Sequence, residues 1–234
     1  MKKILGIDEA GRGCVIGPLV MCGYLVSEEK EADLKKMGAR DSKLLSPRVR
    51  SQLYQKFKEF ADDVVILKIS AEDIDKQRSE TNLNKIEIKH MQHIINALNP
   101  DRVVLDSIEA NTKGFRLKIL HGLKIALKNK EKTGDLEIIS ENFADKYYPI
   151  VGAASIMAKV VRDAEIINLA EKYGDFGSGY TSDPRTIKFL KEWLNKNKQF
   201  PTFVRKSWVT VKEMKKNQAQ KALLSFVEIK KDKE

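Results

Sequence analysis

The sequence is poor in the residues that define several protein classes. It has two cysteines, three histidines and 7% aromatic residues in 234 positions. The two cysteines, Cys14 and Cys22, fit neither a zinc pattern nor a disulfide framework and indicate free thiols. No apolar run approaches the roughly 18 residues that cross a bilayer, and the basic start leads directly into a predicted strand without a signal peptide. We therefore expect a globular cytoplasmic protein with no membrane partner.

Positive charge is abundant. Lysine and arginine total 43 against 33 acidic residues, which gives a net charge of +10. This excess is compatible with a polyanionic partner such as nucleic acid. The basic residues gather near residues 40–50 and again from residue 212 to the end. A basic surface around an acidic pocket is what a metal-dependent nuclease requires, because cations hold the phosphate backbone and carboxylates hold the metal ions.

Short apolar runs and helical periodicities alternate along the chain. The runs predict strands at 3–8, 19–26, 64–69, 102–106 and 136–140, and helices are expected at 46–61 and 86–98. This order favours an α/β fold with a mixed five-stranded sheet flanked by helices. After a glycine-rich loop at 177–184 the sequence pattern indicates helices. We therefore expect a catalytic domain at 1–182 and a helical C-terminal region at 183–234, with a disordered end at 230–234.

Carboxylates follow the apolar runs where buried strands should end. Asp8 and Glu9 follow the first run and precede a Gly-Arg-Gly turn, and Asp106 closes the fourth run. Carboxylates are hard ligands suited to Mg²⁺ or Mn²⁺. A plain polar turn is the alternative at the first site. Asp145 follows the last strand and precedes a long helix, and taken alone it is better explained as a helix cap or turn residue.

The expected helix around 152–163 places polar groups on one face. Ser155, Lys159 and Arg162 fall at positions i, i+4 and i+7, next to small residues that would allow close packing on the sheet. The first two could then lie near a phosphate. The alternative is an ordinary amphipathic helix with a solvated polar side.

Taken together and in order, these segments resemble ribonuclease HII, and two of them resemble its archaeal branch. The matching segments are 6–13 (GIDEAGRG), 17–20 (GPLV), 41–46 (DSKLLS), 105–107 (LDS), 144–145 (AD), 153–163 (AASIMAKVVRD), 177–186 (GSGYTSDPRT) and 204–208 (VRKSW). The resemblance covers nearly the whole chain. One departure is Cys14, which stands where the family usually carries proline or another small residue.

The resemblance implies a ribonuclease H-like fold and a metal-dependent endoribonuclease. The expected substrates are RNA/DNA hybrids and duplex DNA with a single embedded ribonucleotide, cut 5′ to the ribonucleotide with two Mg²⁺ or Mn²⁺ ions to leave a 3′-hydroxyl and a 5′-phosphate. The expected role is ribonucleotide removal in DNA replication and repair. The implied catalytic and metal-binding residues are Asp8, Glu9, Asp106 and Asp145. The implied or expected substrate contacts are Gly11, Arg12, Gly13, Arg40, Lys43, Ser155, Lys159 and Tyr180.

The C-terminal segment 220–227 (QKALLSFV) resembles a sliding-clamp binding box. One helical turn would present Leu223 and Phe226 to an apolar pocket, with Gln220 at its start. The usual second aromatic residue is replaced by Val227, and packing of the same side chains on the protein itself is the alternative. We expect a monomer. Two competing functions are a ribonuclease HIII, which usually has an extra N-terminal domain, and a non-catalytic hybrid-binding module.

Overall fold

The computed structural model describes residues 1–39, 45–126 and 136–231. Within them all five predicted strands are present, with ends that differ by at most two residues from the expected ones. Their bounds are β1 Lys3–Ala10, β2 Leu19–Ser27, β3 Asp63–Ile69, β4 Arg102–Asp106 and β5 Glu137–Glu141.

The strands form one mixed sheet in the order β3-β2-β1-β4-β5. β2 runs antiparallel to both β1 and β3, whereas β1, β4 and β5 are mutually parallel. The ladder between β1 and β4 ends at the pair Ile7 and Leu105. The next residues along the two chains, Asp8 and Asp106, therefore come to the same edge of the sheet. The predicted mixed five-stranded sheet is confirmed.

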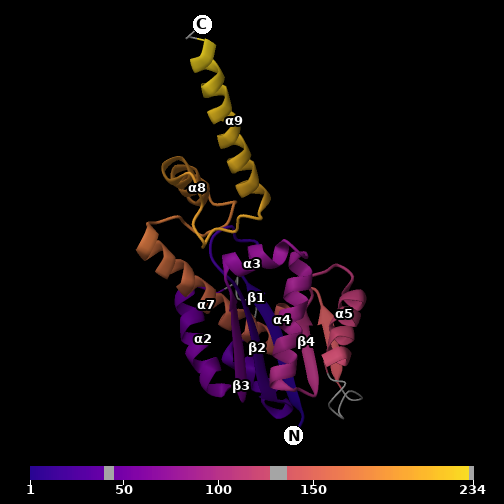
Figure 1. Cartoon of the computed structure of the whole chain (residues 1–234). Helices are drawn as coiled ribbons and strands as arrows, with labels where there is room; N and C mark the ends of the chain where they lie inside the picture. Colours follow the sequence, from indigo (N-terminus) through magenta and orange to yellow (C-terminus); the bar gives the residue numbers. More distant parts are fainter. Residues whose placement is uncertain (40–44, 127–135, 232–234) are drawn as a thin grey trace.

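Helices cover both faces of the sheet (Figure 1). Both expected helices are present, and Ser46 caps the first of them by accepting a hydrogen bond from the Val49 amide. The elements found in the described residues are η1 Glu28–Lys30, α1 Glu31–Met37, α2 Pro47–Phe60, α3 Ala71–Arg78, α4 Leu83–Leu98, α5 Thr112–Ala126, α6 Ala144–Tyr147, α7 Pro149–Tyr173, α8 Pro184–Asn197 and α9 Val209–Lys231.

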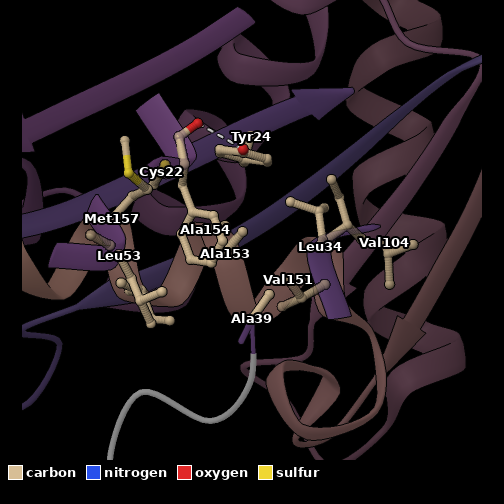
Figure 2. Close-up of a cluster of buried hydrophobic side chains, with 14 of the residues drawn as sticks. Cys22, Tyr24, Leu34, Ala39, Leu53, Val104, Val151, Ala153, Ala154 and Met157 are labelled. Carbon is tan, nitrogen blue, oxygen red and sulfur yellow. Dashed lines mark hydrogen bonds between the residues drawn. The ribbon is translucent and has the colours of Figure 1, made fainter. Parts of the chain in front are cut away.

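The alternation of β1 divides the core into two layers. Ile4 and Ala10 pack with side chains of α1, α2 and α7, whereas Leu5 and Ile7 pack with α3, α4 and α5. This follows from the period of two in a strand. The first layer is shown in Figure 2, where the buried Tyr24 hydroxyl donates to the Phe57 carbonyl of α2 at 2.7 Å.

Gly6 brings α7 close to the sheet. A Cβ at this position would collide with the main chain of Ile150 at the start of α7. The absence of a side chain thus lets the helix lie directly over β1, with its small residues Ala153 and Ala154 fully buried. This contact places the polar residues of α7 beside the end of β1.

The C-terminal helices share a third apolar cluster with the loop after β1. Val15 and Ile16 pack there with Phe176, Leu190 and Val204. α9 then extends away from the body (Figure 1). It continues to Lys231, and residues 232–234 lie outside the described residues, so the expected disorder at 230–234 stays a prediction. The division at residue 182 stays a prediction. None of the helices in the described ranges is long and apolar enough to cross a membrane.

Candidate active site

Asp8 and Glu9 approach the site from opposite faces of the sheet. Asp8 faces α7, where the Ser155 hydroxyl forms a hydrogen bond with its carboxylate. Glu9 faces α4 and lies near the buried carboxylate of Glu87. Adjacent residues of a strand point to opposite faces of the sheet. Asp8 and Glu9 therefore place one carboxylate beside α7 and the other beside α4.

Asp106 and Asp145 complete the acidic group from the neighbouring strands. Asp106 ends β4, and its Oδ1 accepts a hydrogen bond from the Ala144 amide at 3.0 Å. Asp145 follows in the short helix α6 and is buried. Phe143 adopts a left-handed conformation with φ of 62°, which turns the chain from β5 into α6. The hydrogen bond from the Ala144 amide to the Asp106 carboxylate thus links the segments that carry the two acids.

The electrostatics of the acids reflect burial and mutual repulsion. Burial is the main cause that raises the pKa of Asp8 to about 7, with Asp106 and Asp145 adding to the rise and Ser155 opposing it. Burial, followed by Asp8, raises the pKa of Glu9 as well. The buried Glu9 Oε2 has no hydrogen-bond partner in the described structure. A group of buried carboxylates with raised pKa values needs either protons or a cation.

The donor chemistry of this group fits a hard divalent cation such as Mg²⁺ or Mn²⁺. The side chains are not arranged as a finished metal site, since no group of three or more His, Cys, Asp or Glu in the described ranges is positioned to hold an ion. The assignment of the four acids as metal ligands therefore stays a prediction.

A cavity of about 330 Å³ joins most of the predicted site residues. It is lined by Asp8, Glu9, Ala10, Gly11, Arg12, Gly13, Asp106, Ser155, Lys159 and Tyr180. These residues come from β1 and the turn that follows it, from the end of β4, from α7 and from the loop before α8. The structure thus brings three of the four predicted acids and six of the eight predicted substrate contacts to one concavity. The remaining two contacts, Arg40 and Lys43, lie outside the described residues.

The Gly-Arg-Gly turn is fixed by its own geometry and by α4. Gly11 has φ of 86°, and a Cβ there would lie 2.7 Å from the Pro18 carbonyl. The Arg12 side chain points to α4, where its Nε donates to Glu87 Oε2 at 3.0 Å and its Nη2 donates to Asn84. The arginine side chain therefore anchors the turn to α4, although it stays partly exposed.

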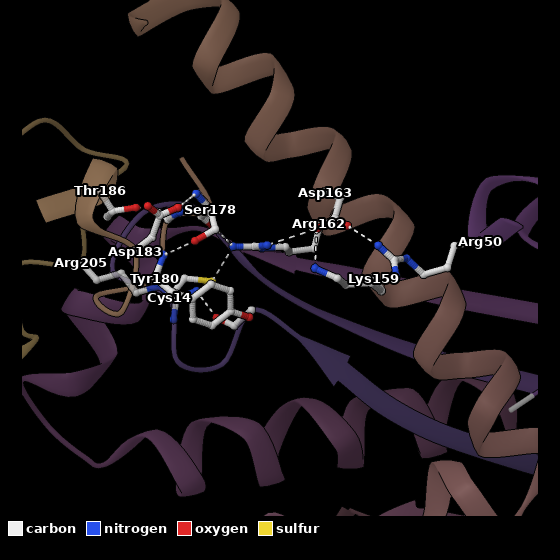
Figure 3. A network of polar contacts seen from close by, with 12 residues as sticks. Cys14, Arg50, Lys159, Arg162, Asp163, Ser178, Tyr180, Asp183, Thr186 and Arg205 are labelled. Atoms are coloured by element: carbon white, nitrogen blue, oxygen red, sulfur yellow. Dashed lines mark hydrogen bonds and ion pairs between the residues drawn. The ribbon is translucent and has the colours of Figure 1, made fainter. Parts of the chain in front are cut away.

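Tyr180 closes the other side of the cavity (Figure 3). The Arg162 guanidinium lies 4.9 Å from the centre of its ring. Arg162 Nη2 also donates to Cys14 Sγ at 3.0 Å and to the Ser178 carbonyl. Burial is the main cause that raises the pKa of Tyr180 to about 12, and Cys14 adds to the rise. Cys14, the departure noted in the sequence, thus packs between the turn and Tyr180.

The helix that carries Ser155 and Lys159 is confirmed as α7. Lys159 Nζ donates to Asp163 Oδ1 at 2.7 Å, and Asp163 also accepts from Arg50 and Arg162. Arg162 is buried, so this face of α7 is not a solvated polar side. The Asp163 carboxylate thus binds three cationic side chains and holds Lys159 at the rim of the cavity.

Two functional candidates escaped the sequence reasoning. Glu87 of α4 has an ionisable carboxyl group and is fully buried. Arg205, in the segment between α8 and α9, is also fully buried. Glu87 had a readable signal, because it shares the buried face of α4 with Met91 and Ile94 at helical spacing. Arg205 stands in a recognised segment, but its contacts with residues 11–17 depend on chain folding over nearly 200 positions.

The predicted clamp segment lies in the outer part of α9. Gln220 is exposed on this helix. Leu223 and Phe226 belong to the same helix, but their side chains lie outside the described residues. Both interpretations of this segment, clamp binding and packing on the protein itself, therefore stay predictions.

The fold and the acidic site define a nuclease of the ribonuclease H-like class. A family model described as Ribonuclease HII matches residues 5–211. A ribonuclease HII of Thermococcus sibiricus is 42% identical over 231 residues, covering 96% of this chain and 98% of that protein. The chain belongs to the ribonuclease HII family, whose members are metal-dependent endoribonucleases acting on RNA/DNA hybrids.

Solved structures of this family are also similar to the chain. The ribonuclease H2 of Pyrococcus horikoshii matches with a TM-score of 0.83 at 38% identity, over 92% of this chain and 98% of that one. The ribonuclease HII in a PCNA complex from Archaeoglobus fulgidus matches with a TM-score of 0.76 at 40% identity, over 88% and 94% of the two chains. Membership of ribonuclease HII removes the ribonuclease HIII alternative.

Proposed function

We propose that this protein cuts the strand 5′ to a ribonucleotide, both in RNA/DNA hybrids and at single ribonucleotides in duplex DNA, and leaves a 3′-hydroxyl and a 5′-phosphate. The observation that carries the proposal is the shared cavity, in which acids of β1 and β4 face the Gly11–Gly13 turn, α7 and Tyr180. The expected biological role is the removal of ribonucleotides from replicated or repaired DNA.

The acids have the chemistry to hold the metal ions. Asp8, Glu9, Asp106 and Asp145 would supply the carboxylate oxygens, and the charges of both Asp106 and Asp145 help to raise the pKa of Asp8. Two bound Mg²⁺ or Mn²⁺ ions would supply an activated water and stabilise the leaving oxygen. The carboxylates are already desolvated by burial, so they gain strongly from a cation.

The remaining cavity residues would bind and select the substrate. Lys159 offers a cation to a phosphate, and its rotation is restrained by Asp163. Main-chain groups of Gly11, Arg12 and Gly13 can approach a 2′-hydroxyl closely because no large side chain covers them. The Tyr180 ring offers a flat surface to the neighbouring sugar, and its hydroxyl, protonated at neutral pH as in other tyrosines, can donate a hydrogen bond.

The direct test is cleavage of an end-labelled DNA duplex with one ribonucleotide, in Mg²⁺ and in Mn²⁺. The wild-type protein should give one product, cut 5′ to the ribonucleotide, and Asp106→Asn should lower the rate by at least about a hundredfold because it removes a charged ligand. The all-DNA duplex is the substrate control. Absence of a metal-dependent cut in the wild-type protein would refute the proposal and favour a non-catalytic hybrid-binding module.

The C-terminal segment supports a second proposal, binding to a sliding clamp. α9 extends away from the body in Figure 1, and Gln220, Leu223 and Phe226 stand at the spacing of a clamp-binding box. The structurally similar protein from Archaeoglobus fulgidus was solved in complex with PCNA. A projecting helix can reach such a partner without displacing the catalytic body.

A further inference from the structure

The buried guanidinium of Arg205 contacts the substrate turn from behind. Its Nη2 donates to the Gly11 carbonyl at 2.7 Å, its Nη1 to the Arg12 carbonyl at 2.9 Å and its Nε to the Gly17 carbonyl at 3.1 Å. The side chain is fully buried, and Trp208 covers its face at 4.8 Å from the ring centre. Arg205 thus connects the C-terminal helical region to the loop after β1.

This burial of a cation is costly and calls for a reason. In the described part of the chain, all three side-chain hydrogen bonds of Arg205 go to main-chain carbonyls. Carbonyl dipoles compensate a buried charge less completely than a carboxylate does, whereas an apolar side chain would leave the three carbonyls without these donors. What an apolar side chain could not do is orient carbonyl groups.

The orientation of these carbonyls also fixes the direction of the amides that belong to the same peptide units. No cis peptide bond occurs in the described ranges, so the N–H of each peptide unit points opposite to its carbonyl. The Gly11 carbonyl shares its unit with the Arg12 amide, and the Arg12 carbonyl shares its unit with the Gly13 amide. Both amides therefore point away from Arg205. Neither donates a hydrogen bond to any described residue, and the turn lines the cavity.

The opposite side of the turn is held as well. The Arg12 side chain is bound by Glu87 and Asn84 of α4, while Arg205 binds the main chain. The turn is therefore fixed at two points on different elements, which limits rotation of its peptide planes. Arg205 also lies beside Cys14 and beside Tyr180, and Tyr180 lines the cavity (Figure 3).

We propose that Arg205 is a positioning residue for ribose selection: it sets the peptide planes of the Gly11–Gly13 turn so that the Arg12 and Gly13 amides meet oxygen acceptors of the ribonucleotide. This inference rests on the proposed function. It makes the C-terminal helical region, through one side chain, a determinant of which nucleotide is accepted. The catalytic acids need no direct contact with Arg205 for this role.

The test compares binding of two duplexes, one with a single ribonucleotide and one of DNA alone, by variants in an Asp106→Asn background so that no cleavage occurs. The measured quantity is the ratio of the two dissociation constants, in Mg²⁺. Arg205→Met should lower the preference for the ribonucleotide duplex by about tenfold, the equivalent of one well-formed hydrogen bond. Arg205→Lys should retain part of the preference, because an ammonium can still donate to one or two carbonyls.

Lys206→Met is the matched control, because Lys206 is the exposed neighbour of Arg205 and touches no part of the turn with its side chain. It should weaken both duplexes alike and leave the ratio unchanged. Thermal unfolding shows which variants fold, and if Arg205→Met does not, Arg205→Lys decides the question.

A folded Arg205 variant with the parent preference, or with equal losses on both duplexes, would overturn the inference. A parent without any preference for the ribonucleotide would instead overturn the proposed function.

Discussion

Replacement of Asp8 by asparagine should stabilise the metal-free protein at alkaline pH while it impairs catalysis. Asp8 is 5% exposed, and burial together with Asp106 and Asp145 raises its pKa from 3.8 to about 7 in the folded protein. A carboxyl group whose pKa rises on folding lowers stability once the pH exceeds its unfolded pKa. The penalty grows between pH 3.8 and 7 and is complete above pH 7.

The difference of about 3 pKa units corresponds to about 4 kcal/mol at 1.36 kcal/mol per unit, as an upper value. An asparagine side chain has nearly the same shape, keeps an oxygen for the Ser155 hydroxyl and carries no charge. For a chain of this size, that gain corresponds to a rise in Tm of roughly 8–16 °C at pH 8. At pH 4.5 the gain should shrink to about 1 kcal/mol, and it should vanish only below pH 3.8, where the unfolded state holds its protons too.

The assay is thermal unfolding followed by circular dichroism in EDTA at pH 4.5 and pH 8, then with Mg²⁺ at pH 8. Added metal should raise the Tm of the wild-type protein more than that of Asp8→Asn, since binding to the folded state stabilises it. Asp33→Asn is the control, because Asp33 forms only an exposed pair with Lys36 and should shift Tm little. An Asp8→Asn variant that is no more stable than wild type at pH 8, or equally stabilised at both pH values, would refute the reasoning.

The substrate turn and the tail give two further predictions. Gly11→Ala should destabilise the fold by about 1–3 kcal/mol, because φ is 86° and the added Cβ would lie 2.7 Å from the Pro18 carbonyl. Gly13→Ala should have the same Tm as the wild-type protein and a higher KM for the ribonucleotide duplex. The added Cβ would lie 3.7 Å from the Tyr180 ring, in the space for substrate. The opposite pattern in Tm and KM would contradict this. Deletion of residues 220–234 should abolish clamp binding in a pull-down and leave hybrid cleavage intact, and retained binding would disprove the clamp assignment.

The deletion leaves the packing of the C-terminal region in place. Met214 and Val211 belong to the third apolar cluster and precede the cut. Gln218 Nε2 also remains to donate to the Leu194 carbonyl of α8 at 2.9 Å. Loss of clamp binding in the shortened protein would therefore report on the removed segment.

The local sequence determined individual strands and helices, including the strand that carries Asp8. The apolar run before Asp8 predicts β1, and Ser46 with Pro47 predicts the start of α2, because strand burial and helix capping depend on residues close in the chain. The placement of Asp8 and Asp106 at one sheet edge depends on the parallel pairing of β1 with β4, which the structure shows and the sequence pattern does not predict. The resemblance to ribonuclease HII then supplied the roles of Asp145 and Tyr180, which spacing alone left open.

The tertiary structure decided how the site is held together. Arg205 binds carbonyls of residues 188 to 194 positions away, Arg162 reaches Cys14, and Glu87 of α4 anchors Arg12. In sequence these residues read as surface charges or helix residues, because a charge is usually solvated and its burial depends on partners brought by folding. Side-chain identity thus determined which chemistry is available at this site, and long-range packing determined which charges leave water to position it.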